Sequence, residues 1–139
     1  MDNFLFLRIE KILQENHDEL VKSLKQLSQQ FAIEIVEFLP HGGMIEIGKF
    51  MYSLDMLIGA HGAGMNNYYW CREGTVVIEI GFYDSSFTLP DMYYCFARSI
   101  GLKYYSSLAL HGGYGTPLKA DIPDIMEIVS GEVEAFLKK

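Results

Sequence analysis

Hydrophobic and polar positions change period several times along the chain, and these changes predict its strands and helices. Short apolar or alternating runs predict strands at 4–9, 31–39, 55–60, 75–81 and 103–108. Apolar residues at steps of three and four, or short segments between two strands, predict helices that start at 16, 44, 65, 90 and 123. The second, third and fourth of these end at 54, 71 and 100, and the last covers about 123–138. Strands and helices therefore alternate along the whole chain.

This alternation predicts an α/β fold. Strands joined by helices pair in parallel through right-handed crossovers. The run Met56, Leu57 and Ile58 is apolar on both faces, as expected for a strand covered by helices on both sides. We therefore expect a Rossmann-like three-layer sandwich with a mostly parallel sheet of about five strands. The 139 residues suffice for one domain, 1–139.

Local signals predict where the helices begin and end. Asn16 with Glu19 has the spacing of a capping box at the start of the first helix. Gly101 suits a left-handed residue after the fourth helix, and Pro123 suits the first turn of the last one. Gly131 inside that last helix costs about 1 kcal/mol relative to alanine. Residues 110–122 contain glycine and proline and are predicted to be a loop.

Composition and charge exclude several classes of protein. The net charge is −7 and the pI is about 5.0, which argues against binding to a nucleic-acid backbone. No apolar run approaches the roughly 18–20 residues of a membrane span. The residues at the N-terminus lack the basic region of a secretory signal. The two cysteines form neither a disulfide framework nor a metal cluster, and no partner histidine indicates a thiol nucleophile.

The segment His61-Gly62-Ala63-Gly64-Met65-Asn66-Asn67 stands between the third strand and a predicted helix. Ligands of open α/β sheets bind at the carboxyl ends of the strands. Glycines allow a close approach of the backbone, and the start of a helix presents N–H groups and a positive dipole end. His61 adds a side-chain nitrogen. The segment therefore predicts a site for an anion or a diphosphate.

Three common nucleotide signatures are absent from the sequence. The pattern G-x-G-x-x-G would require glycine where Asn67 stands, and it normally follows the first strand. A Walker A lysine motif does not occur, and neither does an Asp-x-Asp pair. These absences leave a metal-dependent sugar-nucleotide site of the Asp-x-Asp kind without support.

At this point the sequence resembles a known family. Residues 52–80 read YSLDMLIGAHGAGMNNYYWCREGTVVIEI. This stretch is similar to the signature of glycosyltransferase family 61, A-D-V-L-I-G-x-H-G-A-G-L-x-N-x-x-F followed by a glycine turn and V-V-E. Met65 replaces the usual leucine and Trp70 the usual phenylalanine. A looser likeness extends over about residues 8–108, with lysine in place of one arginine near the start.

The resemblance implies the donor-binding, C-terminal half of a two-domain GT-B glycosyltransferase. Such enzymes transfer a sugar with inversion from a nucleotide-sugar, commonly a UDP-sugar, and need neither metal nor another cofactor. The glycan or protein acceptor would be bound by an N-terminal half absent from these residues. An alternative is a non-catalytic α/β module that binds a nucleotide or a sugar. Whether the chain alone is active stays open at this stage.

The resemblance also assigns roles to individual residues. His61 would contact the donor diphosphate and stabilise the leaving group. Glu79 would accept hydrogen bonds from the ribose hydroxyls, as an acidic strand-end residue does in other nucleotide folds. The remaining predicted donor-binding residues are Gly62, Ala63, Gly64, Asn67, Arg8 and Lys11. Arg8 and Lys11 would neutralise phosphate charge.

Several other residues admit a functional and a structural interpretation. Tyr68, Tyr69 and Trp70 could stack on a nucleobase, although such residues more often form core. His41 and His111, each followed by two glycines, are predicted to lie in turns, because no second metal ligand stands close to either. Localisation stays open as well: cytoplasmic for a complete chain, the secretory lumen for a fragment of a eukaryotic enzyme.

Overall fold

The computed structural model describes residues 5–10, 15–38, 42–83, 92–113 and 115–138. Five strands form one sheet: β1 (Leu5–Glu10), β2 (Ile33–Phe38), β3 (Met56–Ala60), β4 (Val76–Gly81) and β5 (Lys103–Leu108). Four α-helices and a 3₁₀-helix connect and follow them: α1 (His17–Ser28), α2 (Met44–Ser53), η1 (Ala63–Trp70), α3 (Met92–Ser99) and α4 (Ile122–Leu137). The predicted α/β fold is confirmed.

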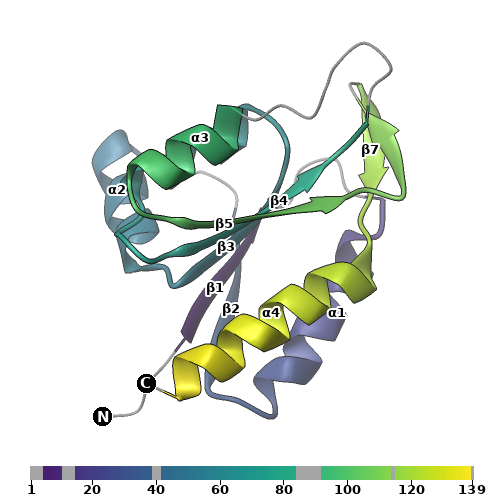
Figure 1. Cartoon of the computed structure of the whole chain (residues 1–139), viewed down its shortest axis with the longest axis horizontal. Helices are drawn as coiled ribbons and strands as arrows, with labels where there is room; N and C mark the ends of the chain where they lie inside the picture. Colours follow the sequence, from purple (N-terminus) through teal and green to yellow (C-terminus); the bar gives the residue numbers. More distant parts are fainter. Residues whose placement is uncertain (1–4, 11–14, 39–41, 84–91, 114, 139) are drawn as a thin grey trace.

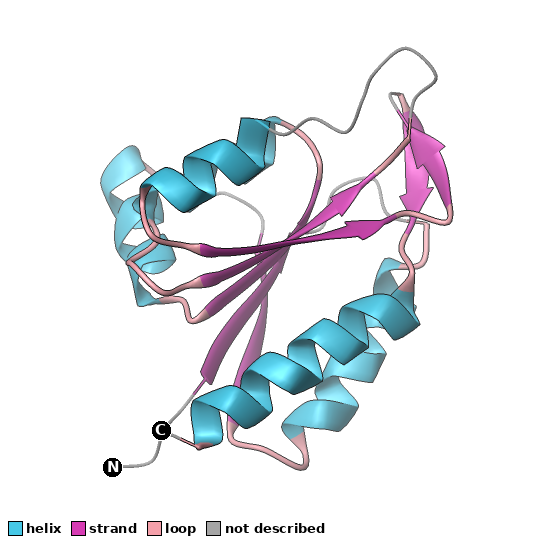
Figure 2. Ribbon diagram, viewed as in Figure 1, coloured by secondary structure: helices cyan, strands magenta, loops and turns pink. Residues whose placement is uncertain are grey.

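The sheet has the order β2-β1-β3-β4-β5, and every neighbouring pair of strands is parallel. Figure 1 shows α1 and α4 together on one face of this sheet and α2 and α3 on the other. Figure 2 shows the same three layers coloured by type of element. The order reverses at β1, because β2 lies on one side of it and β3, β4 and β5 follow on the other. This is a doubly wound arrangement.

The hydrophobic core consists of two clusters, one on each face of the sheet. On the first face, Leu20 and Leu24 of α1 and Ile125 and Val129 of α4 pack against β1, β3 and β4. The second cluster joins α2, η1 and α3 to the opposite face, and its buried members are Met51, Leu54, Leu57, Met65, Tyr68, Cys71, Val77, Tyr93, Ala97 and Leu102. Apolar residues on both faces of β3 explain why its sequence lacks alternation.

The predicted capping box at the first helix does not form. Asn16 is the N-cap residue of α1, but its side chain makes no capping hydrogen bond. Its amide instead donates to the carbonyl of Ala120 and accepts from the N–H of Ala120, both at 2.9 Å. This buried pair joins the start of α1 to the start of α4. The cap at α4 is local, because Asp121 accepts from the N–H of Asp124.

The predicted loop at 110–122 contains two short strands. β6 (His111–Gly113) and β7 (Thr116–Lys119) pair antiparallel in a sheet of their own. Backbone bonds from Ala109 to Gly81 and from Leu110 to Lys119 hold this hairpin beyond the carboxyl ends of β4 and β5, as Figure 1 shows. The two strands lie in close contact at Gly112, which has a φ of +104°. A Cβ atom at this position would collide with the backbone oxygen of Pro117.

The other predicted elements agree with the structure to within one or two residues at most ends. β5 has the predicted bounds, and the predicted short helix at 65–71 is the 3₁₀-helix η1, shifted toward the N-terminus. Gly101 has the expected positive φ, +76°. In the described part of the chain, no helix combines the length and the apolar character needed to cross a bilayer.

Candidate functional site

The segment that begins at His61 lies where the topology predicts a ligand. β3 is next to β1, where the strand order reverses, and His61 directly follows the last residue of β3. Crevices outside the carboxyl ends of such strands are the usual ligand sites of doubly wound sheets. The N–H of His61 donates to the carbonyl of Ile80 at 2.9 Å, so the start of this segment is tied to β4.

Glu79 is a buried acid in the middle of a strand that is otherwise apolar. It is 2% exposed, and every residue of β4 is buried. Its neighbours in the register of the sheet are Gly59 on β3 and Ser106 on β5. Because these two residues are small, larger side chains two positions away on the same face can reach the carboxylate. His61 and Tyr104 occupy those two positions.

Both oxygens of the Glu79 carboxylate are used within the protein. Nδ1 of His61 bonds to Oε1, and the hydroxyl of Tyr104 donates to Oε2. The side chain of His61 is only 7% exposed, and that of Glu79 only 3%. Burial, together with the bond to Glu79, holds the pKa of Tyr104 well above its ordinary value. The three side chains form one buried chain of hydrogen bonds across β3, β4 and β5.

Aromatic rings enclose the imidazole of His61. The rings of Phe82 and Tyr93 meet it edge to face, with centroids at 5.4 and 5.2 Å. The hydroxyl of Tyr93 also donates to the carbonyl of Gly62 at 2.8 Å. Phe82 in turn lies under Gly113 of the hairpin, within 3.6 Å of where a Cβ atom would stand. The surroundings thus hold both the ring and the turn after it.

Gly62 has a backbone conformation that favours glycine. Its φ is +154° and its ψ is −179°, a region that residues with a side chain rarely enter. Its carbonyl accepts from the N–H of Met65 at 3.0 Å, which closes the first turn of η1. The N–H groups at the start of a helix suit an anion. The turn thus leads directly into the start of η1, where the sequence analysis predicts backbone donors for a diphosphate.

The structure places Glu79 differently from the strand end that the sequence analysis predicts. Glu79 lies inside β4, buried, with one oxygen bonded to His61 and the other to Tyr104. The contact seen in the structure is with the side chain of His61, and ribose binding by Glu79 stays a prediction.

The other predicted donor-binding residues lie at different places around the turn. Ala63 and Gly64 open η1, and Asn67 lies half-buried within it. Arg8 is in β1, where it pairs in register with Val36 and Leu57, and Lys11 lies outside the described residues. Arg8 is thus on the strand beside β3, next to the switch in strand order.

The residues that admit a functional and a structural interpretation differ in burial and in position. Tyr68 is fully buried in the core, and burial raises its pKa well above the ordinary value. Tyr69 and Trp70 are about half exposed. His111 belongs to β6 and pairs with Glu15 at 3.0 Å on the surface, whereas His41 lies outside the described residues.

Two residues of this arrangement were not predicted from the sequence, Tyr104 and Tyr93. A signal for Tyr104 does exist. Glu79 interrupts an apolar strand, and a buried carboxylate needs donors on the same face of a neighbouring strand. For Tyr93 the sequence holds no comparable signal, because it reaches Gly62 from a helix.

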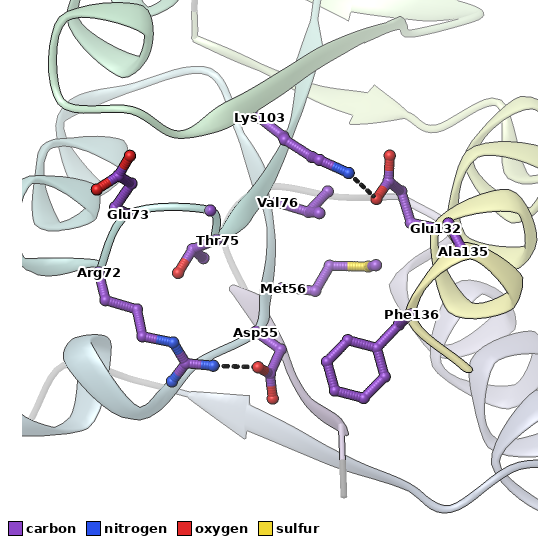
Figure 3. A pocket seen from close by; sticks show the side chains of 11 residues that line it. Asp55, Met56, Arg72, Glu73, Thr75, Val76, Lys103, Glu132, Ala135 and Phe136 are labelled. Atoms are coloured by element: carbon purple, nitrogen blue, oxygen red, sulfur yellow. Dashed lines mark hydrogen bonds and ion pairs between the residues drawn. The ribbon is translucent and has the colours of Figure 1, made fainter. Parts of the chain in front are cut away.

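A cavity of about 190 Å³ lies at the opposite edge of the sheet, at the amino ends of β3, β4 and β5. Figure 3 shows its two cationic side chains already paired, Arg72 with Asp55 and Lys103 with Glu132. It is smaller than the roughly 300–1,000 Å³ of typical ligand pockets and lies at the edge that doubly wound sheets do not use. We therefore do not assign the donor site to it.

Within the ranges described above, His, Cys, Asp and Glu side chains do not gather in any group of three or more that could hold a metal ion.

The glycosyltransferase 61 family model matches residues 13–78. Over this region the chain is similar to glycosyltransferase family 61. A search of curated proteins found no match.

The matched region contains the whole turn from His61 to Asn67 and the two strands β2 and β3. It ends one residue before Glu79, so Glu79, which bonds to His61, and Tyr104, which bonds to Glu79, both lie outside it. The family match confirms the resemblance noted from the sequence and supports a glycosyltransferase. The contacts made by Glu79 and Tyr104 lie outside the matched region and are known from the structure alone.

Proposed function

We propose that this family-61-like region binds a nucleotide-sugar, most simply a UDP-sugar, with the diphosphate at the turn from His61 to Asn67. The observation that carries the proposal is the position of this turn. It follows β3 beside the switch in strand order, and it combines a glycine in an extended positive-φ conformation with a histidine held by a buried carboxylate. Helix-start N–H groups and an imidazole nitrogen are both suited to phosphate oxygens.

The proposed reaction transfers the sugar to a hydroxyl of a glycan or protein acceptor with inversion and without a metal. The acceptor hydroxyl attacks the anomeric carbon and gives its proton to a general base, expected on the acceptor-binding half, while the bond from that carbon to the diphosphate oxygen breaks and its electron pair leaves with the diphosphate. Negative charge then grows on the leaving diphosphate. Backbone N–H groups of the turn and His61 would stabilise this charge electrostatically. In this proposal the region is the donor-binding half of a GT-B enzyme.

Calorimetric titration with UDP and UDP-sugars tests the proposal. His61→Asn is the informative variant, because the asparagine amide can replace Nδ1 as donor to Glu79 while Nε2 is lost. We expect it to weaken UDP binding about ten-fold or more, as for a hydrogen bond to a charged group. The matched control is His111→Asn, which makes the same change at a histidine on the surface strand β6 and should bind UDP like the wild type.

Two results would contradict the proposal. One is a folded wild-type protein that shows no heat of binding with UDP or any UDP-sugar up to millimolar concentration. The other is His61→Asn binding UDP as tightly as His111→Asn. A turnover assay with a radiolabelled donor addresses the alternative of a non-catalytic binding module, which labelled product formed by this chain would exclude.

A further inference from the structure

We propose that Tyr104, acting through Glu79, is a positioning residue that keeps a proton on Nδ1 of His61 and holds the imidazole in one orientation beside the glycine turn. This inference deepens the proposed function and rests on it for the identity of the ligand. The sequence motif does not include Tyr104, and the matched region ends before it. Three observations carry the inference: the burial of Glu79, the donors on its two oxygens, and the register of the strands.

A carboxylate as buried as that of Glu79 requires hydrogen-bond donors. Removing a charge from water costs several kcal/mol unless its oxygens are hydrogen-bonded. The described contacts provide one donor for each oxygen, Tyr104 on Oε2 and His61 on Oε1. The hydroxyl of Tyr104 therefore satisfies one oxygen of the carboxylate and keeps the other turned toward the imidazole.

The chemistry of these contacts decides the tautomer of His61. An ionised carboxylate only accepts hydrogen bonds, so the nitrogen facing it must carry the proton. That nitrogen is Nδ1. Nε2 of this neutral tautomer carries no proton and accepts hydrogen bonds, so it donates to a phosphate oxygen only when the ring is doubly protonated, with Nδ1–H still held by Glu79. A histidine whose Nδ1–H is held by a carboxylate keeps one ring orientation, which is what a contact to a leaving group requires.

The register of the sheet separates Tyr104 from its neighbour. Successive residues of a strand point to opposite faces. Tyr104 therefore lies on the face of Glu79, where its ring also meets that of Tyr94 at 5.7 Å. Tyr105 points to the other face, and its hydroxyl donates to Glu132 of α4 at 2.5 Å. The two adjacent tyrosines thus bond to two different glutamates. Of these two glutamates, Glu79 is the one that bonds to His61.

The test is ¹⁵N NMR of the imidazole nitrogens in the full chain, labelled at histidine. We expect Nδ1 of His61 in the wild type to show the shift of a protonated nitrogen and Nε2 that of an unprotonated one at alkaline pH. Tyr104→Phe should move the resonances toward a mixture of tautomers, whereas Tyr105→Phe should leave them unchanged. Tyr104→Phe should also weaken UDP binding roughly three- to ten-fold.

The inference is overturned if wild-type His61 carries its proton on Nε2, or if Tyr104→Phe and Tyr105→Phe give the same His61 spectrum. The wild-type spectrum decides the tautomer even if a variant fails to fold. The spectra require no ligand, so they also separate the two proposals. A wild type that does not bind UDP but shows the expected tautomer would refute the donor site and retain the positioning role.

Discussion

Glu79 determines the character of the site at the scale of single residues. A glutamate in the fourth position of an apolar strand is an unusual choice for packing alone, because its charge must be satisfied inside the protein. Its carboxylate instead bonds to a histidine from the end of β3 and a tyrosine from β5. The site is therefore built across three strands of the sheet, which hold the imidazole more rigidly than a loop would.

The raised pKa of Tyr104 predicts a pH dependence of stability. Burial and the bond to Glu79 keep its proton in the folded protein, whereas a tyrosine in the unfolded chain ionises near pH 10. Above about pH 10 the unfolded state binds fewer protons than the folded state, so the free energy of unfolding falls as the pH rises. The stability that Tyr104 contributes is fully present below that pH.

Urea unfolding followed between pH 8 and 11 measures this dependence. We expect the free energy of unfolding of Tyr104→Phe to fall less steeply above pH 10 than that of the wild type. Equal slopes for the two proteins would show that Tyr104 ionises in the folded state as readily as in the unfolded chain.

At this scale the sequence predicted the position of the turn but not the contacts of Glu79. His61 and Gly62 follow β3 as predicted, because a glycine turn after a buried strand is a local signal. The burial of Glu79 depends on β3 and β5, whose residues lie 19 or more positions away along the chain, so no local pattern reveals it.

At the scale of elements, the hairpin of β6 and β7 extends the structure beyond the carboxyl ends of the sheet. It lies against Phe82, whose ring packs on His61, so the hairpin supports one wall around the imidazole. Its close strand contact depends on Gly112, where a side chain would collide with the backbone of Pro117 and Leu118.

A pair of glycine substitutions tests this contact. Gly112 and Gly115 both have positive φ, but only Gly112 has backbone atoms within 3 Å of where a Cβ atom would stand. Gly115→Ala should destabilise the protein by about 1–2 kcal/mol, the cost of a left-handed residue. Gly112→Ala should cost about 1–3 kcal/mol more, because the strands must separate. Equal melting temperatures of the two variants would contradict the close approach.

The elements that were predicted and those that were missed differ in the range of their signals. β5 and α2 follow from runs of apolar residues and nearby turn signals. The hairpin was predicted to be a loop, because His-Gly-Gly and a strand with proline carry no alternating pattern. The capping box failed because Asn16 bonds to Ala120, 104 residues away, which no local pattern reveals.

At the scale of the whole molecule, the two edges of the sheet have different characters. The carboxyl edge carries the glycine turn, the buried hydrogen-bond chain and the hairpin. The amino edge carries the 190 Å³ cavity, whose cationic side chains are paired with acids (Figure 3). The central claim is that a nucleotide-sugar diphosphate binds at the carboxyl edge.

The most direct test is ¹H–¹⁵N NMR of the backbone amides during a titration with UDP. The account predicts that the largest and earliest shifts are those of Gly62, Gly64 and their neighbours up to Asn67, saturating with a single dissociation constant. Amides at the other edge, Gly74 and Lys103, serve as the internal control and should change little. Saturable shifts centred on Gly74 and Lys103, with the turn after β3 unaffected, would contradict the claim.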